Sequence, residues 1–311
     1  MDGTLAPLAL IAGPTASGKS DLAVQLAIRL NEVGREAAVI NCDSAQVYRD
    51  LRVLSARPDE DEMAGVPHFL FGEWDGAKAC STAEWANAAK GVIADCHSRG
   101  VVPILVGGTG LYMRTLLDGI SPIPPIKPDI RAEIRAMDQS DARTALENED
   151  PSAAARLAPA DTARTARALE VVRSTGKPIS FWQGKPAGGI GSSVELNSLI
   201  LLPNREELYR KCDLRFELML EYGAVEEVEA LLSRDLNPEL PVMRAIGVRE
   251  IAAWLKGEVS RDEMIHSGQQ STRQYAKRQF TWFRNQPPED WPRMAPDKFD
   301  IGNIFERLLR K

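Results

Sequence analysis

The chain has 311 residues, of which 44% are hydrophobic, 26% charged and 6% aromatic, and its formal net charge is −6. This composition excludes disordered and collagen-like chains, and the length suffices for one large or two moderate domains. An acidic chain gives no general indication of nucleic-acid binding, although a local basic face can still bind phosphates. The four cysteines form no C-x-x-C pair, so we expect neither a disulfide framework nor a zinc site.

The N-terminal segment lacks a basic stretch, and its apolar run at residues 5–12 is too short to span a bilayer. We therefore expect a cytoplasmic protein that does not bind a membrane, and we expect it to be a monomer.

In the first third of the chain, short apolar runs alternate with helical patterns. Runs at residues 8–12, 37–41 and 101–106 are typical of buried parallel strands, and helical patterns cover 20–31, 82–96 and 111–117. Ser81 and Glu84 have the spacing of a capping box, and Gly100 is expected to end the helix that follows them. The alternation predicts an α/β fold with a parallel sheet.

The composition changes near Gly119, where prolines at 122–125 mark a boundary. Residues 128–176 have a helical pattern, 184–193 are a glycine-rich connection, and 198–202 predict one more strand. The pattern is then helical to about residue 284, and the proline-rich tail from Asn285 is expected to pack loosely. We predict a core formed by 1–119 and 193–311, interrupted by a helical insertion domain at 120–192.

A phosphate-binding motif lies between the first predicted strand and helix. The segment Gly13-Pro14-Thr15-Ala16-Ser17-Gly18-Lys19-Ser20 matches G-x-x-x-x-G-K-[ST]. Its glycines let several backbone N–H groups point at one phosphate, Lys19 would neutralise the terminal phosphates, and Ser20 would hold Mg²⁺. The core is thus expected to be a P-loop NTPase-like parallel sheet flanked by helices. The residues alone leave the phosphate compound open; ATP is the default, although no acidic residue ends the third strand.

Two polar residues follow the next two predicted strands, Asp43 after residues 37–41 and Thr109 after 101–106. The carboxyl ends of parallel strands line the ligand crevice, so Asp43 should face the phosphate loop, whereas Thr109 lies in a glycine turn at the start of a second helix. Asp43 could accept a proton from a nucleophile or reach Mg²⁺ through water, and the Thr109 hydroxyl could bind a phosphate or an amine. The alternative for each is a plain helix N-cap.

A basic stretch occupies residues 273–284, with four basic residues and no acidic one. If it is helical, one face carries Arg273, Lys277, Phe280 and Arg284. Cations beside an aromatic ring suit a nucleic-acid backbone with a stacked base. The alternative is a solvated face with Trp282 and Phe283 in the core. A weaker cluster consists of Arg164, Arg167, Arg173 and Lys177.

Taken together, these motifs resemble the bacterial tRNA dimethylallyltransferase (tRNA isopentenyltransferase) family over nearly the whole chain. The segments that carry the resemblance are 13–20, 43–49, 107–112, 164–170, 244–249 and 273–284. The chain departs from the family at 53–58, V-L-S-A-R-P in place of an I-G-T-A-K-P-like run, and at 67–70, P-H-F-L in place of P-H-H-L. Arginine in place of lysine keeps the charge but changes the donor geometry.

The resemblance implies transfer of a dimethylallyl group from dimethylallyl diphosphate to the exocyclic amine of the adenosine 3′-adjacent to the tRNA anticodon, with release of diphosphate. The phosphate loop would then hold the donor's diphosphate with Mg²⁺, served by Lys19, Ser20 and Arg215. Asp43 would be the general base, and Thr109 would contact the acceptor nucleotide. The positions that match tRNA-contacting residues are Asp43, Ser44, Ala45, Gln46, Thr109, Arg131, Ala163, Arg164, Thr165, Ala166, Arg167, Arg244, Arg249, Lys277, Arg278, Phe280 and Arg284.

Three other functions compete with this interpretation: a kinase of a small metabolite, prenyl transfer to free adenine nucleotides, and an RNA-binding ATPase-like module. The long insertion and the 273–284 face argue against a free nucleotide, which needs no such clamp. We further predict that base and donor enter the crevice from opposite sides.

Overall fold

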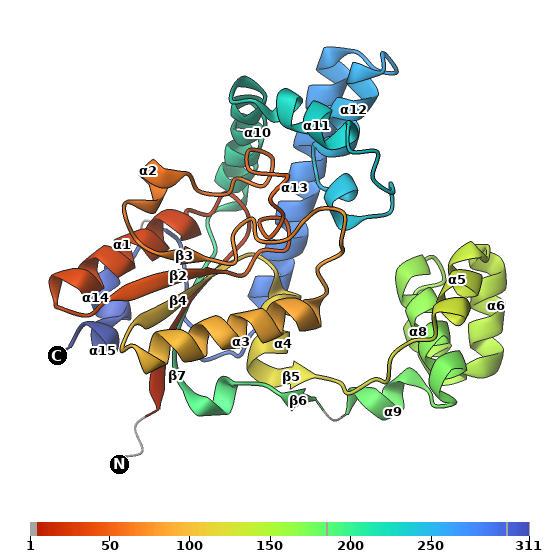
Figure 1. Ribbon diagram of the computed structural model, residues 1–311, viewed down its shortest axis with the longest axis horizontal. Coiled ribbons are helices and arrows are strands. Elements are labelled where there is room, and N and C mark those ends of the chain that lie inside the picture. Colours follow the sequence, from red (N-terminus) through yellow and green to blue (C-terminus); the bar gives the residue numbers. More distant parts are fainter. Residues whose placement is uncertain (1–4, 185, 297, 311) are drawn as a thin grey trace. The chain divides into compact units, whose positions relative to one another are not determined.

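The computed structural model describes residues 5–184, 186–296 and 298–310. The chain divides into two compact units (Figure 1). The α/β unit contains the chain up to Leu116 and from Ile190 onward, and the helical unit is Leu117–Gly189. The helical unit thus begins and ends a few residues earlier than the predicted 120–192.

The α/β unit contains a six-stranded sheet in the order β3-β2-β4-β1-β7-β8. All of its strand pairs are parallel, and its central strands are almost entirely buried, as expected where helices cover both faces. The strands are β1 (Ala6–Ala12), β2 (Ala37–Asn41), β3 (His68–Phe69), β4 (Val102–Gly107), β7 (Val194–Leu201) and β8 (Arg293–Met294). The predicted α/β fold is confirmed. The two-residue strands β3 and β8 were not predicted.

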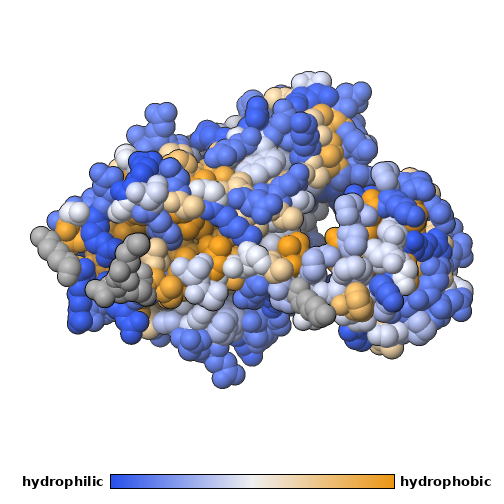
Figure 2. All heavy atoms as spheres, turned by 60° about the horizontal axis from the view of Figure 1, so that its bottom comes forward, coloured by the Kyte–Doolittle hydropathy of each residue, from blue (hydrophilic) through white to orange (hydrophobic). Residues whose placement is uncertain are grey.

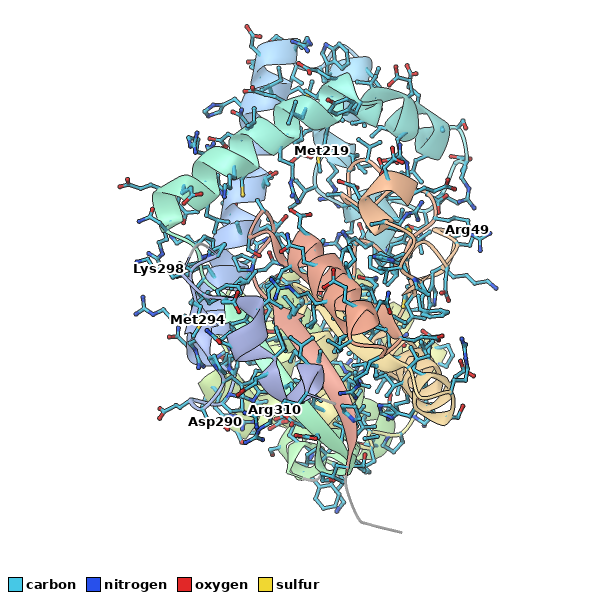
Figure 3. The ribbon with its side chains drawn as sticks, turned by 90° about the vertical axis from the view of Figure 1, so that its left-hand side faces the viewer. Arg49, Met219, Asp290, Met294, Lys298 and Arg310 are labelled. Atoms are coloured by element: carbon cyan, nitrogen blue, oxygen red, sulfur yellow. The ribbon has the colours of Figure 1, made fainter. Side chains whose placement is uncertain are left out.

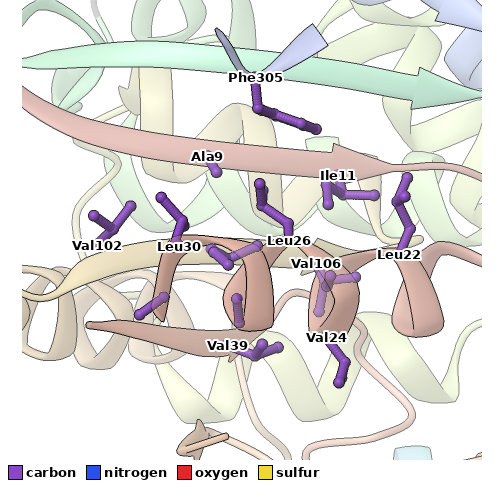
Figure 4. Close-up of a cluster of buried hydrophobic side chains, with 14 of the residues drawn as sticks. Ala9, Ile11, Leu22, Val24, Leu26, Leu30, Val39, Val102, Val106 and Phe305 are labelled. Carbon is purple, nitrogen blue, oxygen red and sulfur yellow. The ribbon is translucent and has the colours of Figure 1, made fainter. Parts of the chain in front are cut away.

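The helices that follow the first strands are amphipathic as predicted. In α1 (Lys19–Glu32), the predicted leucine stripe of Leu22, Leu26 and Leu30 packs against the sheet (Figure 4). The capping box of Ser81 and Glu84 is present, with both hydrogen bonds, at the start of α3 (Thr82–Ser98). The remaining helices of this part are α2 (Glu60–Met63) and α4 (Gly110–Asp118).

After β7 the chain is helical, as predicted. The elements are α10 (Arg205–Glu221), α11 (Ala224–Leu232), the 3₁₀ turn η2 (Pro241–Arg244), α12 (Val248–Leu255) and α13 (Arg261–Asn285). The long helices α10 and α13 pack against each other (Figure 3). Leu208 and Cys212 of α10 and Ala276 of α13 share a small apolar cluster with Ala16 of the phosphate loop. This contact brings the C-terminal half of the unit to the loop.

The prediction of a loosely packed tail was wrong. Strand β8 pairs with the end of β7, and the short helices α14 (Ile301–Ile304) and α15 (Glu306–Leu309) follow it. Phe305 and Leu308 are completely or almost completely buried, in the same core as α1; Figure 4 shows Phe305 there. Burial of these two side chains fixes the segment in place, although its prolines and charges are typical of a solvent-exposed segment.

The helical unit has a core of its own. Its helices are α5 (Pro128–Ala136), α6 (Gln139–Glu149), α7 (Pro151–Arg156), α8 (Thr162–Thr175) and α9 (Ile179–Gln183). Ile134, Leu146 and Leu169 are buried together with several alanines, which lets the short helices pack closely. Strands β5 (Gly119–Ile120) and β6 (Ala187–Gly188) pair antiparallel, and the 3₁₀ turn η1 (Gly191–Ser193) leads into β7. On the face drawn in Figure 2, this unit is mainly hydrophilic.

Within the described residues, no helix is both long and apolar enough to cross a membrane.

Candidate functional site

The phosphate loop joins β1 to α1 and surrounds a buried cation. Gly18 has φ +83°, a left-handed conformation that favours glycine and that turns the chain into the helix. The Lys19 ammonium is buried and donates to the Pro14 carbonyl at 3.3 Å. Burial lowers the pKa of Lys19 to about 8, the charge of Asp43 opposes this, and that of Arg215 adds to it. The Ser17 hydroxyl is also buried and has no hydrogen-bond partner among the described residues. A buried cation and an unused hydroxyl suit an anionic ligand.

Asp43 lies directly after β2, where Asn41 fixes its main chain. The Asn41 side chain accepts from the Asp43 N–H at 2.8 Å and donates to its carbonyl at 3.1 Å. Oδ1 of Asp43 accepts from the Ala45 N–H at 3.0 Å, and Oδ2 lies beside Gly108. No helix begins after Asp43 in this described stretch, so the N-cap alternative is wrong here. The second carboxylate oxygen is therefore directed at the turn that carries Thr109.

Thr109 follows β4, which lies between β1 and β2 in the sheet. Its carbonyl accepts from the first turn of α4, while its hydroxyl accepts from the Ser44 N–H at 2.9 Å. Burial, and next the charge of Asp43, raise the pKa of Tyr275 on α13. The Thr109 hydroxyl thus binds Ser44, next to Asp43 in the chain, and does not cap the start of α4.

Arg215 reaches the phosphate loop from α10. Its guanidinium donates to Oγ1 of Thr15 at 3.4 Å, and burial lowers its pKa. The structure therefore places Arg215 with Lys19 at the loop, as the resemblance implied.

Two cavities of the α/β unit meet at these residues. The phosphate cavity, about 540 Å³, is lined by the phosphate loop and by Arg52, Arg57 and Lys211. The tyrosine cavity, about 340 Å³, is lined by Tyr48, Tyr112, Tyr275 and mostly apolar neighbours. The residues that line both are Thr15, Asp43, Ser55, Ala56, Arg215 and Met219. Figure 3 shows Met219 on the side of α10 that faces the sheet. An anionic group in one cavity and a planar group in the other would thus meet beside Asp43.

The family model described as IPP transferase matches residues 46–286. The chain belongs to this family. The tRNA dimethylallyltransferase of Erythrobacter litoralis is 68% identical over 99% of this chain and 97% of its own length. That of Novosphingobium aromaticivorans is 64% identical over 89% of this chain and 99% of its own length. The predicted resemblance is confirmed.

Solved structures agree with this membership. The tRNA isopentenylpyrophosphate transferase of Bacillus halodurans is 33% identical, with a TM-score of 0.68 over 97% of this chain and 94% of its own. A eukaryotic dimethylallyltransferase, described as acting on tRNA, is 30% identical, with a TM-score of 0.75 over 89% of this chain and 69% of its own. The P-loop NTPase-like fold is thereby confirmed for this member of the IPP transferase family.

Of the residues that the resemblance marks for tRNA in this family member, several surround the two cavities. Ser44, Ala45, Arg244 and Arg278 line the tyrosine cavity, and Gln46 lines the phosphate cavity. The Gln46 amide donates to the Ser55 and Ala56 carbonyls, at 3.1 and 2.7 Å. Gln46 therefore holds the neighbouring turn in place. Arg249 is exposed on α12.

On α13 the predicted basic face is only partly exposed. Arg273 forms an ion pair with Asp213 of α10, at 2.5 Å. The Phe280 ring packs against the apolar cluster at Ala16, and Cζ of Arg205 lies 4.9 Å from its centroid. Phe283 is buried, as in the alternative interpretation. An exposed face shared by Arg273, Lys277, Phe280 and Arg284 was thus the wrong expectation, because α10 covers part of it; the exposed cations are Lys277, Arg278 and Arg284.

In the helical unit, the exposed predicted residues are Arg131 on α5 and Ala163 and Arg164 on α8, with Arg167 partly exposed. The side chains of Thr165 and Ala166 are buried. Arg167 and Arg135 both pair with the buried Glu170, at 3.4 and 2.8 Å. Arg135 lies one helical turn after Arg131 on α5.

The segment 53–58, which departs from the family pattern, is bound by a helix that lies far away in the chain. The Glu227 carboxylate of α11 accepts from three consecutive N–H groups, those of Arg52, Val53 and Leu54. Arg57 donates to the Tyr48 carbonyl at 3.1 Å, and its guanidinium occupies the space where a Cβ on Gly72 would lie. No local pattern could have identified Glu227, because its partners lie far away in the chain.

Proposed function

We propose that this member of the IPP transferase family transfers a dimethylallyl group from dimethylallyl diphosphate to tRNA. The acceptor is the exocyclic amine of the adenosine 3′-adjacent to the anticodon, and diphosphate is released. The observation that carries the proposal is the meeting of the two cavities at Asp43. The names of the relatives at 60–68% identity support the reaction and the tRNA acceptor.

The phosphate cavity suits the donor. Because the lone pair of an adenine amine is delocalised into the ring, the amine is a weak nucleophile and needs a strongly electrophilic partner. The bond between the allylic carbon and the diphosphate oxygen breaks more easily when the leaving electron pair is stabilised. In this proposal Lys19, Arg215, the Ser17 hydroxyl and the loop N–H groups stabilise it, and their position at the phosphate cavity supports this role. Met219, which lines both cavities, gives the isoprenoid an apolar wall.

The tyrosine cavity suits the acceptor base. Target bases in RNA loops can be unstacked and held against aromatic side chains at a cost of about a few kcal/mol. Tyr112 is already stacked on Trp85, with ring centroids 4.4 Å apart, which makes this wall rigid. As the N–C bond forms, the amine loses a proton, and the Asp43 carboxylate accepts it while Thr109 contacts the nucleotide. A filled pair of cavities keeps out the water that would hydrolyse the donor.

Mg²⁺ fits the phosphate cavity as a companion of the diphosphate. The described residues contain no cluster of three His, Cys, Asp or Glu side chains able to hold a metal ion. Mg²⁺ keeps several waters and takes ligands from substrate phosphates together with few protein oxygens. The Ser20 hydroxyl at the cavity would be the protein ligand. When bound, the ion supplies further neutralisation of the leaving group.

In each unit, we assign the binding of tRNA phosphates to exposed arginine and lysine side chains. In the α/β unit these are Lys277, Arg278 and Arg284 of α13, and in the helical unit Arg131 and Arg164. Contacts of cations with phosphates release counterions, so tRNA affinity should fall steeply as salt is raised.

The deciding experiment supplies protein, Mg²⁺, dimethylallyl diphosphate and an unmodified tRNA, and uses mass spectrometry to locate an added five-carbon unit. We expect the unit on the adenosine 3′-adjacent to the anticodon, and none on the same tRNA with guanosine at that position. Adenosine monophosphate replaces tRNA in a parallel reaction. Prenylation of the free nucleotide alone, or ATP consumption without a prenylated product, would contradict the proposal.

A further inference from the structure

We propose that Gln279 of α13 is a positioning residue that fixes the phosphate loop and the Thr109 turn relative to each other. This inference rests on the proposed function. Its side chain is buried, with 6% of the residue exposed. Oε1 accepts from the Thr15 N–H at 2.8 Å, and Nε2 donates to the Gly108 carbonyl at 2.8 Å. One amide therefore links the loop on the donor side to the turn on the acceptor side.

The glycines of the turn make this link possible. A Cβ on Gly108 would lie 2.3 Å from Nε2 of Gln279, and one on Gly110 would lie 2.4 Å from the Trp282 ring. Helix α13 thus lies directly on the turn. The same Gly108 position is 3.2 Å from Oδ2 of Asp43, so the amide and the carboxylate flank one glycine.

Thr15 is held at its N–H and at its hydroxyl. Gln279 binds its N–H, Arg215 donates to its hydroxyl, and Thr15 lines both cavities. A shift of Thr15 would displace the diphosphate relative to Asp43 and the acceptor amine. Misplacement of reacting groups by about 1 Å can slow a reaction on the order of 10²-fold.

The two bonds need an amide, since one end must accept and the other donate. In a Gln279→Glu variant the carboxylate still accepts from Thr15 but faces the Gly108 carbonyl without a proton. In a Gln279→Leu variant both partners are lost at similar volume. A Gln25→Glu variant makes the same change as the first at an exposed position of α1 and serves as the matched control.

We measure single-turnover rates at saturating donor and tRNA across pH, tRNA affinity, and thermal unfolding. Both Gln279 variants are expected to lose on the order of 10²-fold in rate, with tRNA affinity within about threefold of wild type. Relative to wild type at each pH, the Gln279→Glu variant should recover as pH falls, because a protonated carboxyl can donate to Gly108. The Gln279→Leu variant should not recover.

Rates within threefold of wild type, a loss confined to tRNA affinity, or equal pH profiles for the two variants would overturn the assignment. Should the variants fail to fold, hydrogen exchange in the ligand-free wild-type protein still decides it, since the Thr15 amide must then be strongly protected and rapid exchange overturns the proposal. Absence of product from the wild-type protein would count against the proposed function, and the exchange measurement would still test the two hydrogen bonds.

Discussion

Replacing Asp43 by asparagine removes one negative charge from the point where the two cavities meet, while the size of the side chain is kept. Oδ1 of Asp43 accepts from the Ala45 N–H at 3.0 Å, and an amide oxygen can take over that bond. The Asn41 side chain contacts main-chain atoms of Asp43 and the Leu70 carbonyl and no atom of the Asp43 carboxylate, so its hydrogen bonds are unaffected. The variant is therefore expected to fold and to leave both cavities intact.

The expected loss follows from the role of the carboxylate. A positioned proton acceptor contributes about 10²–10⁴-fold to a rate, or about 3–5 kcal/mol of barrier. The substitution has a second, separate effect on Lys19. Burial lowers the pKa of Lys19 to about 8, and the charge of Asp43 keeps it from falling further. Without that charge the pKa of Lys19 falls further, and the ammonium is lost at lower pH.

Single-turnover prenylation at saturating donor and tRNA measures the first effect, and the pH profile of kcat/KM for the donor measures the second. An Asp95→Asn variant removes the same charge from the exposed surface of α3 and should behave as wild type. A single-turnover rate within tenfold of wild type would refute the role of Asp43 as base. A shifted pH profile with an unchanged rate would show that its charge acts only on Lys19.

Lys19 should give kcat/KM for the donor an alkaline limit near pH 8, because its ammonium is charged below its pKa and neutral above; a Lys19→Arg variant, cationic throughout, should lack this limit. Phe305→Ala should lower the free energy of unfolding by about 3–5 kcal/mol in urea titrations, and a change below about 1 kcal/mol would contradict the burial of the tail. Glu227→Gln should raise KM for the donor several-fold, because three N–H groups of the loop carrying Arg52 lose a charged acceptor; an unchanged KM would separate that loop from the donor.

Features that depend on neighbouring residues could be predicted from the sequence. The phosphate loop is one, since Gly18 supplies a left-handed residue where the backbone must curl. The leucine stripe of α1 and the capping box at Ser81 are others, because both act within a few residues of one helix. Such local patterns were enough for the sheet's long strands and for the positions of Lys19 and Asp43.

Orientation towards distant elements could not be predicted. Helical periodicity correctly placed Phe280 on one face with Arg273, but it cannot tell which part of that face α10 covers. Likewise the 164–170 motif does not show that Thr165 points into the helical unit. For the tail, two apolar residues among prolines and charges are too weak a signal, and only the core they complete explains their burial.

The site itself depends on strand order, which differs from chain order. Strand β4 inserts between β1 and β2, so the Thr109 turn lies between the phosphate loop and Asp43. This insertion brings backbones close together, and a Cβ on Gly107 would lie 2.1 Å from the Cys42 carbonyl oxygen. Gly107, the last residue of β4, thus has a structural reason apart from any ligand: without a side chain it lets β4 lie close to the segment that leads to Asp43. Helix α13 packs directly on the Thr109 turn through Gln279. The Gln279 amide fits there because Gly108 has no side chain.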